Sequence, residues 1–296
     1  MENTQGKNLK KYLVWVFAIG WTMQFVASYF ARRGNLALFN GILAVSMFAP
    51  LVSAVLSGEK VRSVGWGFRL KGKLRHWLAA WFLPAVLGCL GAALFFLLFP
   101  KTLSTDLYYI RATLGEAGIA ALEAQGMTVA LYAGVSALSA VTYAPLLNML
   151  FAVGEEAGWR GVMYPALKRR FGTVRGRIAG GVIWGAWHWP VMLLAGYEYG
   201  LRYFGAPVLG PMLFCVIACA MGVLLDRLYE RTGSVWAAAL GHGAINAFAG
   251  VPTLLCGPAY TAGMTIAGPL MIGAVGGIPL MATAVYILIK DAKTES

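Results

Sequence analysis

The chain has 296 residues, of which 59% are hydrophobic and 12% are charged, and its formal net charge at pH 7 is +12. Soluble domains carry about 25% charged residues, so a soluble globule of this size would lack the polar groups that cover a surface. A disordered chain and a disulfide scaffold are excluded as well, the latter because only four cysteines are present. The composition favours a polytopic membrane protein, in which an excess of Lys and Arg reflects topology rather than nucleic-acid binding.

Apolar runs of membrane-spanning length recur along the chain between charged residues. A helix needs about 20 mostly apolar residues to cross the hydrocarbon core of a bilayer. Eight such runs cover residues 12–31, 36–56, 77–99, the end of 127–162, 178–194, 206–225, 235–249 and 264–289. The 37 glycines suit helices that pack closely in lipid. We therefore predict an all-α, polytopic membrane bundle of about eight transmembrane helices, which forms a single transmembrane domain over residues 1–296.

Basic residues are distributed unevenly between the predicted spans. Five of the 24 Lys and Arg residues lie on the side opposite to both termini: Arg32, Arg33, Lys101, Arg111 and Arg202. The other 19, of which Lys7 is the first, share the side of the termini. Cytoplasmic loops are enriched in Lys and Arg, so we predict a multi-pass protein of the cell membrane with both termini in the cytoplasm. The basic stretches 60–75 and 168–177 are interpreted as topology determinants beside anionic lipid.

Three polar sets interrupt the predicted spans. Residues 155–160 read EEAGWR late in the fourth span, residues 184–188 read WGAWH in the fifth, and residues 242–246 read HGAIN in the seventh. Ionisable residues are expensive in a bilayer core, so they mark functional sites by default. His188 and His242 are two of only three histidines, and the third, His76, lies in a basic stretch. We expect the three sets to form the functional site.

The three sets are expected at similar depths in the membrane. At about 1.5 Å per helical residue, Glu155, His188 and His242 each lie roughly 16–20 Å from the nearest cytoplasmic basic residues. The estimate assumes unbroken helices, and two prolines act against that assumption. Pro165 follows the first set, and Pro190 should perturb the fifth helix beside the second.

Spacing within the sets predicts which side chains share a helix face. Glu156 and Arg160 are four residues apart and can pair, and a structural ion pair is the favoured interpretation. Glu155 then lies about 100° around the helix, free to face elsewhere. His242 and Asn246 are also four residues apart, so an imidazole and an amide can address the same volume.

These residue types support one kind of chemistry and leave a second open. A carboxylate and a histidine beside a water molecule can activate it as general base and acid. A histidine and an amide supply donors for a tetrahedral oxyanion. The same Glu155, His188 and His242 could instead hold a zinc ion with one open position, although no HExxH sequence is present. We expect no cofactor, with zinc as the alternative.

Each candidate residue also has a purely structural interpretation. A single intramembrane histidine is often a hydrogen-bonded packing residue, but three ionisable groups on separate helices at one depth favour a functional site. Three tryptophans are interpreted as packing residues, one of which could line a substrate site: Trp184, Trp187 and Trp189.

The three sets together resemble the motifs of the CAAX prenyl protease 2 and bacteriocin-processing (CPBP) family. Those motifs are a Glu-Glu pair with Arg four residues after the second Glu, an aromatic residue four before His, and His four before Asn. Trp184 stands where the family usually has Phe. The resemblance covers about a third of the chain and implies a CPBP-like catalytic core within residues 141–250.

The resemblance also implies roles for individual residues. It implies an eight-helix intramembrane endopeptidase in which Glu155 and His188 activate water. His242 and Asn246 would stabilise the oxyanion, while Glu156 and Arg160 would support the site. A protein or peptide substrate and membrane lipid are the implied partners, and no nucleic acid is expected. Two alternatives remain open at this point, namely a proton-coupled transporter and a non-catalytic bacteriocin-immunity or binding protein on the same fold.

Overall fold

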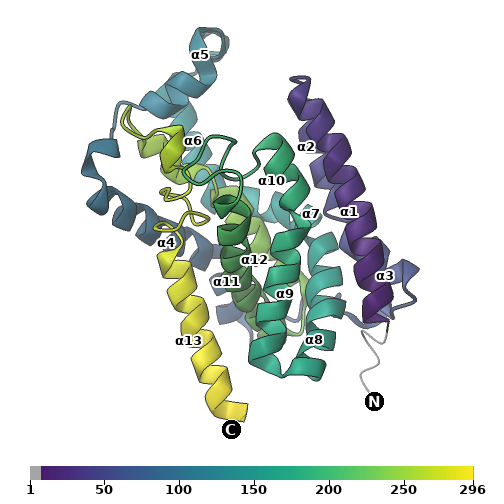
Figure 1. Ribbon diagram of the computed structural model, residues 1–296. Coiled ribbons are helices and arrows are strands. Elements are labelled where there is room, and N and C mark those ends of the chain that lie inside the picture. Colours follow the sequence, from purple (N-terminus) through teal and green to yellow (C-terminus); the bar gives the residue numbers. More distant parts are fainter. Residues whose placement is uncertain (1–7, 296) are drawn as a thin grey trace.

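The computed structural model describes residues 8–295, and the regular elements in that part of the chain are all helical (Figure 1). The predicted all-α fold is therefore confirmed. The α-helices are α1 (Leu9–Arg32), α2 (Leu36–Ser46), α3 (Ala49–Leu56), α4 (Leu74–Leu98), α5 (Tyr108–Glu123), α6 (Val129–Val141), α7 (Ala144–Gly158), α8 (Tyr164–Phe171), α9 (Thr173–Trp187), α10 (Trp189–Ala195), α11 (Leu209–Thr232), α12 (Val235–Phe248) and α13 (Ile278–Glu295).

Several of these helices are long and apolar enough to cross a membrane. Within the described residues there are five by length and composition, or seven when each of two bent pairs counts as one span. The bent pairs are α2 with α3, at 40°, and α6 with the continuous helix from Ala144 to Phe171, at 52°. Both second helices carry a proline near their start, Pro50 and Pro145, where a missing N–H removes no helical bond. The predicted count of eight is not reached.

The last predicted span, residues 264–289, differs most from the structure. Its first half contains turns and a short 3-10 helix, and α13 begins only at Ile278. The sequence of this half, GPLMIGAVGG at 268–277, is apolar but rich in glycine. Glycine is a poor helix former because it loses the most backbone freedom on folding. An apolar run of spanning length is therefore not one helix here.

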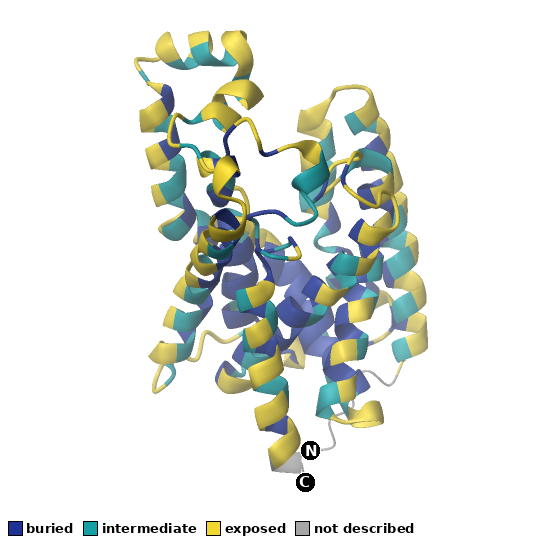
Figure 2. Cartoon of the chain, turned by 60° about the vertical axis from the view of Figure 1, so that its left-hand side comes forward, coloured by how far each residue is buried: buried dark blue, intermediate teal, exposed yellow. Residues whose placement is uncertain are grey.

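Small residues let the helices that carry the site approach each other closely. A Cβ atom at Gly181 of α9 would lie 2.3 Å from the Cα of Cys219 in α11, and one at Gly185 would lie 2.7 Å from the Cα of Cys215. Only glycine allows α9 and α11 to touch backbone to backbone at these points, as is usual between helices in lipid. Buried residues concentrate in the middle of the bundle, where α11 and α12 lie (Figure 2).

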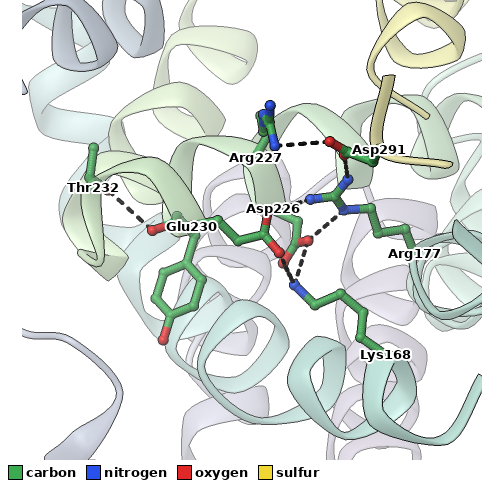
Figure 3. Close-up of polar contacts among 8 residues, drawn as sticks. Lys168, Arg177, Asp226, Arg227, Glu230, Thr232 and Asp291 are labelled. Atoms are coloured by element: carbon green, nitrogen blue, oxygen red, sulfur yellow. Dashed lines mark hydrogen bonds and ion pairs between the residues drawn. The ribbon is translucent and has the colours of Figure 1, made fainter. Parts of the chain in front are cut away.

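A network of ion pairs joins α8, α9, α11 and α13 near the end of the bundle where α13 terminates (Figure 3). Arg177 is fully buried and contacts three carboxylates, at 2.6 Å from Asp226, at 2.6 Å from Glu230 and through a third pair with Asp291. Lys168 lies 2.7 Å from both Asp226 and Glu230. These two basic residues, interpreted from the sequence as topology determinants, hold four helices together.

The chain ends of the described part lie at the same end of the bundle (Figure 1). Helix α1 starts there at Leu9 and α13 ends there at Glu295. The cytoplasmic location of both termini, which the distribution of basic residues predicts, stays a prediction. Lys7, the first residue in that count, lies outside the described residues.

Candidate active site

Glu155 is a buried carboxylate held by two indole rings. It lies near the end of α7, and its Oε2 accepts hydrogen bonds from Trp159 Nε1 at 2.9 Å and from Trp184 Nε1 at 2.8 Å. Two N–H donors fix the position of this oxygen in the buried site. Because both bonds go to Oε2, the indoles leave Oε1 free for other partners.

A π-helical turn, η3 (Trp159–Met163), follows Glu155 and carries the chain into α8. Pro165 stands at the start of α8 and has no N–H to donate to the preceding turn. A wider turn with i→i+5 bonds accommodates that loss, and such turns are frequent at functional sites. The helix therefore continues past Pro165, with a π-helical turn in place of regular α-helix before it.

His188 occupies the break between α9 and α10. Helix α9 ends at Trp187 and α10 begins at Trp189, so the perturbation predicted from Pro190 is confirmed. The Nδ1 atom of His188 lies 2.9 Å from the carbonyl oxygen of Trp184. A carbonyl only accepts, so Nδ1 carries the proton of the neutral ring and Nε2 carries the lone pair.

His242 of α12 forms a hydrogen bond with Glu156 rather than with Glu155. Its Nδ1 lies 2.8 Å from Glu156 Oε1, which also accepts from Arg160 at 3.0 Å. The predicted Glu156–Arg160 pair is thus present, and a histidine shares it. The Arg160 guanidinium also lies over the rings of Tyr164 and Trp184, at 4.7 and 4.5 Å from their centroids.

A cavity of about 450 Å³ brings four predicted site residues together, from α7, the α9–α10 junction and α12: Glu155, His188, His242 and Asn246. Glu156 and Arg160 do not line it and lie fully buried behind His242. Asn246 is exposed to the cavity, one helical turn after His242. The structure therefore separates the predicted residues into a cavity-lining group and a supporting pair.

Other cavity-lining residues were not predicted as site residues. Trp184 and Trp187, interpreted from the sequence as packing residues, line the cavity, and Trp184 also binds Glu155. Gln24 of α1 and Glu198 of the loop after α10 line it too. Glu198 has a left-handed backbone, with φ at 74°, and burial raises the pKa of its carboxyl group to about 7. A lone glutamine in an apolar span was a usable signal for Gln24, whereas nothing in the sequence marks Glu198.

Some of the side chains that line the cavity are of the types that bind metal ions. In the part of the chain that the structure describes, no group of three or more His, Cys, Asp or Glu side chains could hold a metal ion. The alternative zinc set, Glu155, His188 and His242, does not form such a group. Both histidines bond through Nδ1, which leaves Nε2 as the ring atom that can face a ligand.

Known proteins resemble the segment that carries the site. Residues 136–248 match the Rce1-like family model, described as type II CAAX prenyl endopeptidase Rce1-like. CAAX prenyl protease 2 of Methanococcus maripaludis is 27% identical over 101 residues. These residues are 34% of this chain and 37% of the relative, so the similarity spans about a third of each protein. The matched segment contains all three motifs, and the predicted resemblance to the CPBP family is confirmed.

Proposed function

We propose that the chain, whose residues 136–248 match the type II CAAX prenyl endopeptidase model, is an intramembrane endopeptidase of a membrane-associated protein or peptide. The observation that carries this proposal is the convergence of Glu155, His188, His242 and Asn246 on one cavity. A carboxylate, an imidazole with a free Nε2 and an amide are the groups that hydrolysis by activated water requires.

In the proposed reaction Glu155 removes a proton from water, and the water oxygen attacks the carbonyl carbon of the scissile peptide bond. The Nε2 atom of His188 has a lone pair, because Nδ1 donates to a backbone carbonyl. It can accept the proton that Glu155 took from water, which restores the carboxylate, and deliver it to the leaving nitrogen as the C–N bond breaks. The products are a new carboxyl group and a new amine.

His242 and Asn246 are proposed to stabilise the oxyanion that forms on the carbonyl oxygen. The amide of Asn246 supplies N–H donors. A donor at Nε2 of His242 requires a ring protonated at both nitrogens, because Nδ1 already donates to Glu156. The carboxylate of Glu156 accepts the Nδ1 proton and fixes the orientation of the ring. Glu156 and Arg160 are therefore supporting residues in this mechanism.

The proposal is tested by cleavage of internally quenched hydrophobic peptides by the purified protein, with products identified by mass spectrometry. We expect cleavage by the wild type. Proton-driven uptake into liposomes is measured in parallel, because buried Glu and His residues also serve carriers. Uptake without cleavage would contradict the protease mechanism and favour a transporter. Tight peptide binding without cleavage would favour a binding protein.

Removing the proposed oxyanion donor should weaken turnover without abolishing it. We expect Asn246→Ala to lower kcat about 10²- to 10³-fold and to leave residual activity, because a single donor is lost. Asn246→Asp has the same size but places a negative charge near the oxyanion, so it should be less active than Asn246→Ala. Equal activity of both variants and the wild type would contradict the assigned role of Asn246.

We propose that hydrolysis requires no metal ion, because Glu155, His188 and His242 do not form a group that could hold one in the part of the chain that the structure describes. Activity should therefore be unchanged after prolonged dialysis against a strong chelator. The measurement is turnover before dialysis, after dialysis and after addition of one equivalent of zinc. Loss of activity that stoichiometric zinc restores would contradict this prediction and make Glu155 a candidate ligand.

We further propose that the protein crosses the cell membrane several times with both termini in the cytoplasm. Single cysteines at the exposed positions Lys71 and Glu116 test this orientation. An impermeant thiol reagent applied to intact cells should label Glu116→Cys above the wild-type background, and Lys71→Cys only after lysis. Labelling of both variants from outside would contradict the predicted topology.

A further inference from the structure

The break at His188 leaves two backbone groups without their usual helical partners. In a continuous helix the N–H of Val191 would donate to the carbonyl oxygen of Trp187. Pro190 lies between them, has no N–H and opens the new helix α10. Both groups are buried, and a buried backbone group that stays unpaired is strongly destabilising. Another part of the protein must therefore satisfy them.

The side chain of Gln24 satisfies both groups at once. Its Nε2 donates to the carbonyl oxygen of Trp187 at 2.8 Å, and its Oε1 accepts from the N–H of Val191 at 3.3 Å. Gln24 lies on α1, 163 residues before Trp187, and is only 1% exposed. The amide thus replaces one backbone hydrogen bond by two and keeps the helix open at His188.

Helix α1 holds the same junction at a second point. The indole N–H of Trp187 donates to the carbonyl oxygen of Val16 at 3.0 Å. Gly20 makes room for that ring, because a Cβ atom there would lie 1.9 Å from Trp187 Nε1. The residue directly before His188 is therefore fixed by α1 through both its carbonyl group and its side chain.

We infer that Gln24 is a positioning residue that sets the orientation of His188 in the cavity. This inference rests on the proposed function, in which His188 moves a proton. Without the amide, the Trp187 carbonyl and the Val191 N–H both lose their partner, and the junction that holds His188 is no longer fixed in one conformation. Helix α1 lies outside the segment that matches the family model. The two hydrogen bonds of Gln24 therefore come from a separate part of the chain.

Two substitutions at position 24 separate hydrogen bonding from packing. Gln24→Leu keeps the bulk but makes neither bond. Gln24→Glu makes both bonds only while neutral, because a neutral carboxyl group has one donor and one acceptor and its charged form has no donor. Gln125 is exposed on the loop after α5, so Gln125→Leu and Gln125→Glu are the matched controls.

We expect Gln24→Leu to lower kcat about 10- to 100-fold, the effect of a displaced catalytic group, with KM within about twofold of the wild type. Its activity relative to the wild type should not vary with pH. Gln24→Glu should approach wild-type kcat at low pH and fall towards Gln24→Leu as pH rises and the carboxyl group ionises. Other titratable side chains line the cavity, namely those of Glu155, His188, Glu198 and His242. These groups are present in each variant and in the wild type, so the rate of each variant is divided by the rate of the wild type at the same pH.

A readout that does not need cleavage is hydrogen exchange of a peptide that contains Val191. Exchange should be faster in Gln24→Leu than in the wild type and both controls. Wild-type kcat in Gln24→Leu, or a Gln24→Glu variant that matches Gln24→Leu at every pH, would overturn the inference. Absence of cleavage by the wild type would instead contradict the proposed function. Unchanged exchange at Val191 in Gln24→Leu would contradict this inference separately.

Discussion

Glu155→Gln is expected to lower kcat by at least about 10²- to 10⁴-fold, the contribution of a positioned general base, while the fold is retained. The carbonyl oxygen of a glutamine can accept both indole hydrogen bonds that Oε2 of Glu155 accepts from Trp159 and Trp184. The variant therefore keeps the size and the contacts of the side chain but removes its basicity. Turnover and the melting temperature are measured in the same detergent.

The control for this prediction is Glu116→Gln, which makes the same change at an exposed position of α5. It should leave turnover and the melting temperature unchanged. A fully active Glu155→Gln would sink the water-activation mechanism. An inactive variant with a greatly lowered melting temperature would show instead that the carboxylate is needed for folding.

Hydropathy predicted the helices that are apolar over their whole length. The runs 12–31, 77–99 and 235–249 correspond to α1, α4 and α12 within about three residues. The run 264–289 failed because hydropathy measures apolar character and not backbone preference, and its glycines favour an irregular conformation. The bends after α2 and α6 were missed for a related reason, since an apolar segment can bend without any change in its composition.

Spacing along one helix predicted the local part of the site, and tertiary contacts account for the rest. The i, i+4 rule was sufficient for Glu156 and Arg160, which lie 3.0 Å apart. It could not show that His242, 86 residues later, binds the same carboxylate oxygen. The indole donors to Glu155 were missed because an intramembrane tryptophan has a large apolar body, which favoured a packing interpretation.

Arg160→Ala is expected to destabilise the protein strongly, because it leaves the buried carboxylate of Glu156 without its cation. Both side chains are fully buried, and removal of one partner of such a pair costs about 3–5 kcal/mol. For a chain of 296 residues this corresponds to a fall in melting temperature of roughly 5–8 °C. His242 remains as a partner of Glu156, so thermal melting should show a less stable protein that still folds.

A double variant distinguishes the ion pair from the packing of the guanidinium. Among the described residues, Arg160 Nε, Arg160 Nη2 and Glu156 Oε2 have no hydrogen-bond partner, so the pair is only partly satisfied. Replacing both charges by neutral groups of similar size can therefore recover stability, as is common for buried ion pairs. Glu156→Gln with Arg160→Met should melt above Arg160→Ala, because the amide oxygen can still accept from His242 and the thioether fills the space between Tyr164 and Trp184. If the double variant melts as low as Arg160→Ala, the stacking of the guanidinium on those two rings is the stabilising contact, and the charge of Glu156 contributes little.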